Sequence, residues 1–193
     1  MFAFKNEINH PQKWGEYFTV HSYEADFNGK ARLVSIFQYL QEIAWHHAKV
    51  NKRGYYDLAK INKGWVLSRM AIHIDQYPLW GEPLQIITWP KGLDRLFALR
   101  DFQIYRGDEL LGVATSCWLI IDLDSRRPQR PEPYFREFDF SGLEDAWDYK
   151  MKNLPNLQKP SNAYKVQVGY NDLDVNQHVT SYKYIEWACN AFP

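Results

Sequence analysis

Hydrophobic residues recur at helical spacing in an early segment of the chain and alternate with polar residues in later ones. Between residues 33 and 44 the apolar positions lie three or four apart, which predicts a helix with one buried face. These positions are Leu33, Ile36, Phe37, Leu40, Ile43 and Ala44. A strand over residues 17–23 and a turn at residues 26–29 are expected to precede this helix. Gly54 and the polar segment near residues 60–64 end the helical pattern.

Alternation of apolar and polar positions predicts an antiparallel sheet after the helix. The predicted strands are residues 70–74, 84–88, 96–106 and 110–123, and the predicted turns are residues 78–81, 90–92 and 107–109. Residues 118–121 are apolar on both faces, as expected of a covered central strand. A long helix followed by antiparallel strands predicts an α+β fold in which the sheet wraps around the helix.

The end of the chain repeats the pattern of its beginning. A tyrosine-containing, strand-like run at residues 164–170 leads into Asp174-Val-Asn-Gln-His178 and then into a helix-like run. The same order occurs 148 positions earlier, around Asp26-Phe-Asn-Gly-Lys30. A pattern repeated at a domain-sized interval suggests two copies of one fold. No strands follow the second helix, so we expect either an incomplete second unit or another surface that covers this helix.

The segment between the two copies has a different composition. Residues 126–133 are charged and rich in proline, and Pro155 and Pro160 follow, which is typical of a linker that crosses the protein surface. Several aromatic residues indicate that this linker packs down on the protein. They are Tyr134, Phe135, Phe138, Phe140 and Trp147. We therefore divide the chain into a first unit (residues 1–125), a linker (126–162) and the start of a second unit (163–193).

Composition excludes several classes of protein. The 23 Lys and Arg residues balance 23 Asp and Glu residues, so net charge indicates neither nucleic acid nor an anionic membrane as a partner. No apolar run is long enough to span a membrane, and the first residues lack the features of a secretory or transit peptide. Two cysteines form no disulfide framework, which favours a reducing compartment. The aromatic fraction of 17% suits a fold that encloses a long apolar ligand, but it also suits ordinary packing.

Asp174, Asn176 and His178 carry the candidate chemistry. A spacing of two places their side chains on one side of an extended segment, and Asp174 and His178 are also neighbours on a first helical turn. A carboxylate can orient an imidazole, and an amide or helix N-terminal N–H groups can stabilise an oxyanion, which suits hydrolysis of an acyl bond. Spacing alone leaves open a structural alternative, an Asp cap with an Asn turn and a surface His.

Other reactive residues are expected to have structural roles. Cys117 and Cys189 lie at apolar positions and are expected to pack in the core. His46 and His47 have no third metal ligand in sequence, so no metal site is expected. Lys30 replaces the histidine in the first copy and could act as a base only if strongly desolvated. No nucleotide-binding motif is present, and we expect no cofactor.

The chain resembles the acyl-acyl-carrier-protein thioesterases of bacteria and plant plastids. Residues 170–187 resemble the signature of that family, and segments of the first half match its N-terminal unit in order and spacing. These segments are residues 65–70, 77–81, 87–89, 100–101 and 114–118. The resemblance extends from about residue 17 to the end. It implies two tandem hotdog folds, each a long helix wrapped by an antiparallel sheet, of which the second is incomplete in this chain.

The resemblance also implies an activity. Asp174, Asn176 and His178 match the catalytic Asp, Asn and His of the family, whose members hydrolyse the thioester of fatty acyl chains on acyl carrier protein. The absence of a transit peptide fits the bacterial branch, and hence the cytoplasm. The family has a further catalytic acidic residue some thirty positions after the histidine, so we expect this chain to be inactive or impaired. Thr180 and Ser181 stand where the family often has two asparagines.

Two alternatives to this function stay open. One is hydrolysis of acyl-coenzyme A, and the other is a non-catalytic acyl-binding hotdog protein. A homodimer and the acyl chain length are also left open. Three arginines of the linker could contact an acidic carrier protein, although a solvated linker is the simpler interpretation. They are Arg126, Arg127 and Arg130.

Overall fold

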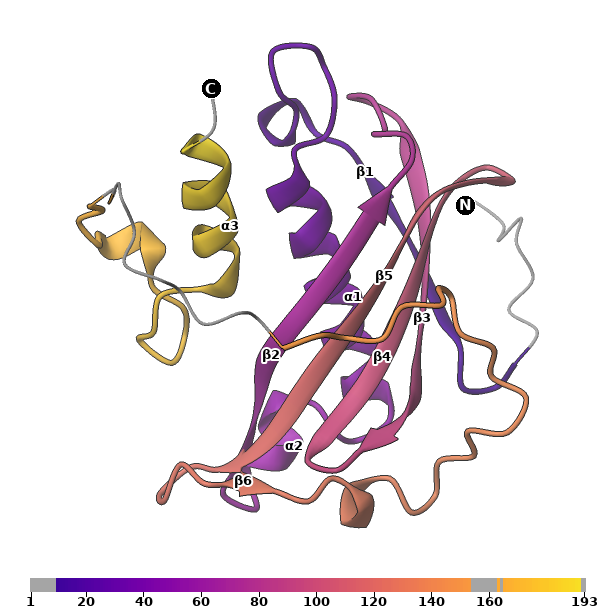
Figure 1. Cartoon of the computed structure of the whole chain (residues 1–193), viewed down its shortest axis with the longest axis vertical. Coiled ribbons are helices and arrows are strands. Elements are labelled where there is room, and N and C mark those ends of the chain that lie inside the picture. Colours follow the sequence, from indigo (N-terminus) through magenta and orange to yellow (C-terminus); the bar gives the residue numbers. More distant parts are fainter. Residues whose placement is uncertain (1–9, 154–162, 164, 192–193) are drawn as a thin grey trace.

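One long helix and the sheet that wraps around it form the centre of the molecule (Figure 1). The computed structural model describes residues 10–153, 163 and 165–191. Its strands are β1 (Trp14–Thr19), β2 (Lys63–Ile74), β3 (Pro83–Asp94), β4 (Phe97–Arg106), β5 (Glu109–Asp122) and β6 (Pro128–Gln129). Its helices are α1 (Leu33–Val50), α2 (Tyr55–Ala59) and α3 (Ser181–Asn190), with short 3-10 helices η1 (Ser22–Glu24), η2 (Glu132–Tyr134) and η3 (Tyr170–Asp172).

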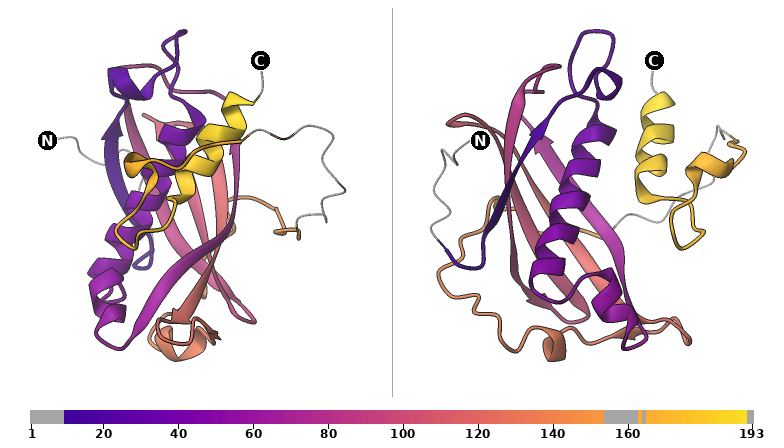
Figure 2. Two further views of the ribbon diagram at one scale, coloured as in Figure 1. Left: turned by 90° about the vertical axis from the view of Figure 1, so that its left-hand side faces the viewer. Right: turned by 180° about the vertical axis from the view of Figure 1, so that it is seen from behind.

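The sheet is antiparallel, and its strands follow the order β1-β3-β4-β5-β2, with β6 paired to β5. α1 crosses one face of this sheet, as the view from behind in Figure 2 shows. This arrangement confirms the predicted α+β fold and the hotdog architecture that the resemblance implies. None of the described helices is long and apolar enough to cross a membrane.

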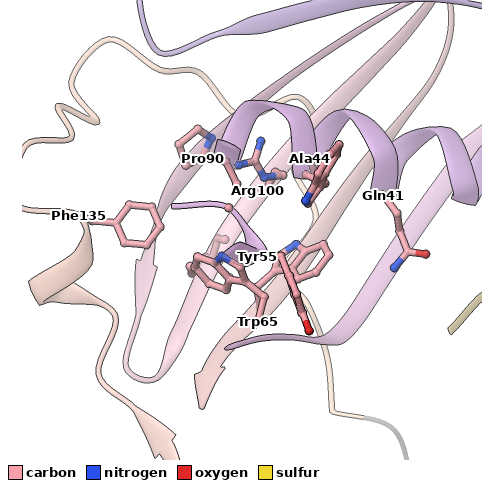
Figure 3. Close-up of a pocket in the computed structure, with 13 residues that line it drawn as sticks. Gln41, Ala44, Tyr55, Trp65, Pro90, Arg100 and Phe135 are labelled. Carbon is pink, nitrogen blue, oxygen red and sulfur yellow. The ribbon is translucent and has the colours of Figure 1, made fainter. Parts of the chain in front are cut away.

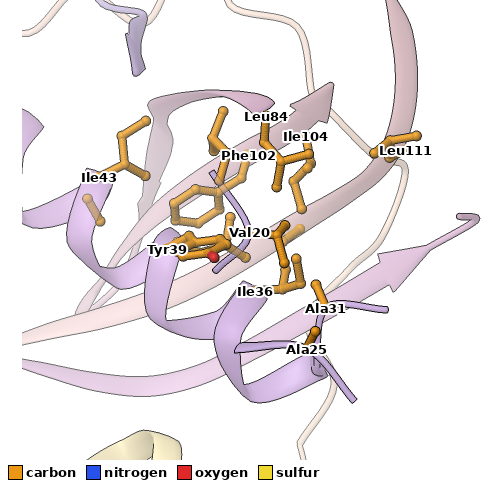
Figure 4. Packing of buried hydrophobic residues seen from close by; sticks show 14 residues of the cluster. Val20, Ala25, Ala31, Ile36, Tyr39, Ile43, Leu84, Phe102, Ile104 and Leu111 are labelled. Atoms are coloured by element: carbon orange, nitrogen blue, oxygen red, sulfur yellow. The ribbon is translucent and has the colours of Figure 1, made fainter. Parts of the chain in front are cut away.

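The core lies between α1 and the inner face of the sheet (Figure 4). Ile36, Leu40 and Ile43 of α1 are completely buried, and they pack with Phe102 and Ile104 of β4. Full burial of each such side chain contributes about 1.5–3 kcal/mol. The helical spacing therefore predicted the correct face of α1, and the helix ends at Val50, before the predicted break at Gly54.

The predicted end of the second strand at residues 90–92 is wrong. β3 continues through Pro90 to Asp94 with a bulge between Pro90 and Gly92. The register of β1 explains why proline is tolerated, because β1 begins at Trp14, opposite Thr88. Beyond Thr88 this side of β3 is a sheet edge, where a missing N–H group costs little.

The predicted strand over residues 17–23 is correct only in part. β1 starts earlier, at Trp14, and ends at Thr19 opposite Pro83. The Glu24 carboxylate then accepts a hydrogen bond from the His21 N–H group at 2.7 Å and turns the chain into η1. Helix α2 was not predicted, because its five residues are too few for a periodic pattern.

β5 is the longest strand and is not an edge strand, as predicted, and the structure places it between β4 and β2. Its continuously buried part is residues 111–117, however, rather than residues 118–121. Ile120 is also completely buried, opposite Gln129 of β6, whereas Trp118, Leu119 and Ile121 are only partly buried. Trp118 contributes instead to the wall of a cavity.

A buried ion pair holds the linker against the outer face of the sheet. The Asp101 carboxylate is 0% exposed, and its Oδ2 atom lies 3.2 Å from Lys91 Nζ. The same Oδ2 atom accepts a hydrogen bond from the Ala146 N–H group at 2.8 Å, and Lys91 Nζ also lies 3.3 Å from Asp145. Burial raises the pKa of Asp101, while the hydrogen bonds and Lys91 oppose this shift. The sheet and residues 145–146 are thus joined through one desolvated carboxylate.

The aromatic residues of the linker pack as expected. Phe135 is buried, and its ring lies 5.6 Å from that of Phe138 and 6.2 Å from that of Phe140. Arg126, Arg127 and Arg130 are exposed. Pro155, Pro160 and Tyr164 lie outside the described residues, and the domain boundaries at residues 125 and 162 stay a prediction.

The second unit differs from its prediction in two respects. Residues 165–169 form no strand, because no described segment pairs with them as β3 pairs with β1. Helix α3 lies beside α1, as the views in Figures 1 and 2 agree. Cys189 on α3 is exposed, so the expected core packing of this residue is wrong, whereas Cys117 is buried as expected.

Candidate active site

The three candidate catalytic residues lie in a tight turn between η3 and α3. The Asp174 Oδ1 atom accepts hydrogen bonds from the backbone N–H groups of Asn176, at 2.8 Å, and His178, at 3.1 Å. The Asp174 N–H group donates to the His178 carbonyl at 2.8 Å, which closes the turn. Gln177 takes the left-handed conformation, with φ of 62°, that the turn requires. The aspartate side chain therefore holds the backbone of the other two residues in place.

The turn that begins at Asp26 has the same hydrogen bonds. Its Oδ1 atom accepts from the N–H groups of Asn28, at 2.8 Å, and Lys30, at 2.9 Å. Its own N–H group donates to the Lys30 carbonyl at 2.7 Å, and Gly29 has φ of 75° where the second turn has Gln177. A 3-10 helix precedes each turn and an α-helix follows it. The two turns thus share the same hydrogen bonds, which confirms the internal repeat seen in the sequence.

The side chains of the three residues do not bond to one another. Among the described residues no hydrogen bond joins the Asp174, Asn176 and His178 side chains to one another. Asn176 Oδ1 instead accepts a hydrogen bond from the Tyr55 hydroxyl at 3.2 Å, and the His178 side chain is exposed. In the described part of the chain the imidazole and the Asn176 amide nitrogen have no protein partner. Both groups can therefore contact a ligand.

A mainly apolar cavity of about 150 Å³ lies between α1 and the inner face of the sheet (Figure 3). Trp45, Trp65 and Trp118 line it, together with residues of α2, β3, β4 and the linker. The Trp65 and Trp118 N–H groups are satisfied by the Arg53 carbonyl and the Ser116 hydroxyl, each at 2.8 Å. Their rings can therefore present apolar surface to the cavity, which suits an aliphatic ligand.

Tyr55 connects the cavity to the turn. It is the first residue of α2 and lines the cavity, while its hydroxyl group donates to Asn176. Glycine at residue 54 lets α2 begin close to the end of α1, because a Cβ atom on this residue would lie 3.0 Å from the Lys49 Cα atom. The edge of an apolar cavity in the first unit thus lies next to the candidate catalytic turn of the second.

Arg100 brings a positive charge to the cavity wall. It lies on the inward face of β4, and its Nη1 atom donates to His47 Nδ1 at 3.0 Å and to Thr88 Oγ1 at 3.1 Å. Burial lowers the pKa of His47 to about 3, and the nearby positive charge of Arg100 is the second cause of this shift. His47 is therefore neutral, and its Nδ1 atom can accept this hydrogen bond. Burial also lowers the pKa of Arg100 to about 10, which leaves it charged at neutral pH.

The sequence analysis gave neither Tyr55 nor Arg100 a role in the site, although residues 100–101 are one of the segments that resemble the family. Arg100 could have been noticed, because it is a charge within the apolar inward set of β4, between Ala98 and Phe102. Tyr55 carried no such signal, since its position depends on how α2 packs.

The two adjacent histidines of α1 have different partners. His46 pairs with Glu16 at 2.7 Å, whereas His47 faces Arg100. Among the described residues no group of three or more His, Cys, Asp or Glu side chains is arranged to hold a metal ion. Lys30, in the place of His178, is exposed.

Solved structures of similar fold include acyl-ACP thioesterases. A crystal structure of an acyl-ACP thioesterase from Bacteroides thetaiotaomicron is 29% identical, with a TM-score of 0.72, covering 94% of this chain and 74% of that one. The 12:0-ACP thioesterase from Umbellularia californica is 25% identical, with a TM-score of 0.80, covering 95% of this chain and 76% of that one.

Curated relatives have the same family name. Oleoyl-acyl carrier protein thioesterase 2, chloroplastic, of Arabidopsis thaliana is 33% identical over 92% of this chain and 53% of its own length. The chain thus spans about half the length of the curated relatives it matches. Residues 11–138 match the acyl-ACP thioesterase N-terminal domain, and residues 156–193 match the acyl-ACP thioesterase C-terminal domain. The chain therefore belongs to the acyl-ACP thioesterase family.

Proposed function

We propose that the protein hydrolyses the thioester between a fatty acyl chain and acyl carrier protein, with the acyl chain held in the cavity of the first unit. The observation that carries this proposal is the position of Tyr55, which lines the apolar cavity and bonds to Asn176 of the candidate catalytic turn. A thioester carbonyl beside this turn would leave its aliphatic chain next to the cavity. Relatives named oleoyl- and 12:0-ACP thioesterases support the choice of substrate class.

Each residue of the turn has a distinct role in this proposal. His178 removes a proton from a water molecule, whose oxygen forms a bond to the thioester carbonyl carbon. The Asn176 amide nitrogen donates to the carbonyl oxygen as negative charge develops there. The carbon–sulfur bond then breaks to release the fatty acid, and the thiolate sulfur of the carrier takes up the proton from His178 to become the free thiol. Asp174 is a positioning residue, because its carboxylate is engaged with the backbone of the turn.

The direct test is release of free fatty acid from acyl carrier protein thioesters by the protein expressed from its complete coding sequence. We expect hydrolysis of acyl-acyl carrier protein with a kcat/KM well above that for the matching acyl-coenzyme A. A preference for acyl-coenzyme A would replace the proposed substrate by the coenzyme thioester. Tight binding of acyl thioesters without turnover would instead identify a non-catalytic acyl-binding protein and reject hydrolysis.

The repeat supplies a matched control for the role of Asp174. Asp174→Ala removes the acceptor of two N–H groups, and the resulting displacement of Asn176 and His178 is expected to lower kcat by about 10²-fold. Asp26→Ala removes the same two bonds from the first copy, which should cost about 1–2 kcal/mol of unfolding free energy but leave kcat unchanged. Steady-state kinetics and urea unfolding measure both effects. Equal losses of kcat in the two variants would show that the Asp174 bonds only support the fold.

We also propose that the protein works in a reducing cytoplasm. Both cysteines are free thiols, and Cys189 is exposed, which suits a compartment that keeps thiols reduced. Fractionation of the source cells tests this location, and recovery of the protein from an oxidising compartment or an organelle would contradict it.

A further inference from the structure

The cavity wall carries a positively charged side chain, Arg100, that has no carboxylate partner among the described residues. Asp101 is adjacent in sequence but faces the other side of the sheet, since neighbouring residues of a strand point to opposite faces. The Asp101 carboxylate is engaged there by Lys91 at 3.2 Å and by the Ala146 N–H group. It cannot neutralise Arg100.

The hydrogen-bonding capacity of Arg100 is only partly used. A guanidinium group has five N–H donors. Nη1 donates to His47 at 3.0 Å and to Thr88 at 3.1 Å, and both of these partners are neutral. Within the described part of the chain the Nε and Nη2 donors have no partner, and Arg100 is partly exposed to the cavity that it lines. A desolvated charge with unused donors is unfavourable unless an acceptor reaches it.

The surroundings of Arg100 determine the shape of ligand that can reach it. Figure 3 shows Arg100 beneath α1, beside Pro90, and Tyr55 on another side of the cavity, beside Trp65. The other side chains that line the space between them are mainly apolar, including three tryptophans. An extended aliphatic chain with its far end at Arg100 would match both the apolar walls and the buried charge.

We propose that Arg100 binds a carboxylate at the inner end of an aliphatic chain that occupies the cavity. This inference extends the proposed function, because such a carboxylate has two sources. One is the free fatty acid product, bound with its carboxylate inward. The other is an acyl substrate with a second carboxylate at its distal end. The two sources share the same contact with the guanidinium group and differ in their effect on turnover.

The primary test is a binding experiment that does not require hydrolysis. Decanoate and 1-decanol have equal chain lengths and differ in charge, and the tryptophans of the cavity provide a fluorescence signal for titration. We expect decanoate to bind the wild-type chain at least about tenfold more tightly than 1-decanol, since hydrogen bonds between charged groups are stronger than those of a neutral hydroxyl group. Equal affinities for the two probes would overturn the proposal without any variant.

Substitution then assigns the preference to Arg100. Arg100→Met is expected to abolish the preference for decanoate while leaving 1-decanol binding unchanged or stronger. Arg100→Lys keeps the charge without the planar fork and should retain part of the preference, which covers the case in which Arg100→Met fails to fold. Arg95→Met changes an exposed arginine of the β3–β4 turn, outside the cavity wall, and should bind like the wild type. A preference that persists in both Arg100 variants would overturn the assignment.

Kinetics distinguishes the two sources of the carboxylate. If the ligand is the product, decanoate inhibits wild-type hydrolysis competitively, and Arg100→Met weakens this inhibition about tenfold or more. If the ligand is a substrate, the acyl carrier protein thioester of decanedioate has a lower KM than that of decanoate, and Arg100→Met removes this difference. A protein that hydrolyses neither thioester but still prefers decanoate in the titration would contradict the proposed function and support the binding site.

Discussion

Replacement of His178 by alanine is expected to lower the kcat/KM for acyl-acyl carrier protein by about 10²- to 10⁴-fold, the usual contribution of a general base. The imidazole is exposed, and no described side chain bonds to it. The bond from residue 178 to Asp174 uses the backbone N–H group, which alanine retains. Stability should therefore stay within about 0.5 kcal/mol of the wild type, as for ordinary surface substitutions.

Lys30 provides the control for this substitution. It occupies the position of His178 in the first turn, and its N–H group bonds to Asp26 in the same way. Lys30→Ala makes an equivalent change to an exposed side chain and should leave kcat/KM unchanged. Release of fatty acid and thermal unfolding are measured for both variants. Wild-type rates in His178→Ala would contradict the assignment of the base.

Replacement of Lys91 by methionine is expected to destabilise the protein by about 3–5 kcal/mol, because it leaves a buried carboxylate without its cation. Asp101 is 0% exposed, and among the described residues Lys91 is its one ion-pair partner. The remaining bond from the Ala146 N–H group compensates only part of the cost of desolvation. Urea unfolding at pH 7 measures the effect, which should exceed that of any exposed lysine.

The pH dependence of Lys91→Met identifies the carboxylate as the cause. The pKa of Asp101 is raised by burial, so the folded protein holds this proton more strongly than the unfolded chain does. Stability therefore falls as pH rises through the folded pKa, and the loss caused by Lys91→Met should shrink as pH is lowered. A double variant that combines Lys91→Met with Asp101→Asn should recover part of the lost free energy of unfolding at pH 7. A double variant no more stable than Lys91→Met would contradict this explanation.

Local patterns predicted the fold where one element faces one core. The three- and four-residue spacing of Ile36, Leu40 and Ile43 identified α1, because a helix against a single sheet buries a single stripe. Strand limits were less predictable, since they depend on neighbouring strands. Pro90 lies within β3 because β1 does not reach it, and residues 165–169 form no strand because nothing described pairs with them.

The candidate site was predicted in part. The turn from Asp174 to His178 repeats a local pattern, and its backbone geometry follows from nearby residues. The spacing suggested that the carboxylate faces the imidazole, whereas the structure shows it bonded to N–H groups. The contact between Tyr55 and Asn176 joins residues 121 positions apart, and the cavity around Arg100 combines several elements. Neither follows from any short segment of sequence.

The two aspartate turns show how little of the loop depends on the reactive side chain. Backbone groups and one carboxylate maintain each loop, whether its fifth residue is lysine or histidine. After gene duplication, a single codon change at that residue could therefore add or remove a reactive group without disturbing the loop. One copy could specialise in retaining the ligand while the other acquired chemistry, and both would inherit the same scaffold.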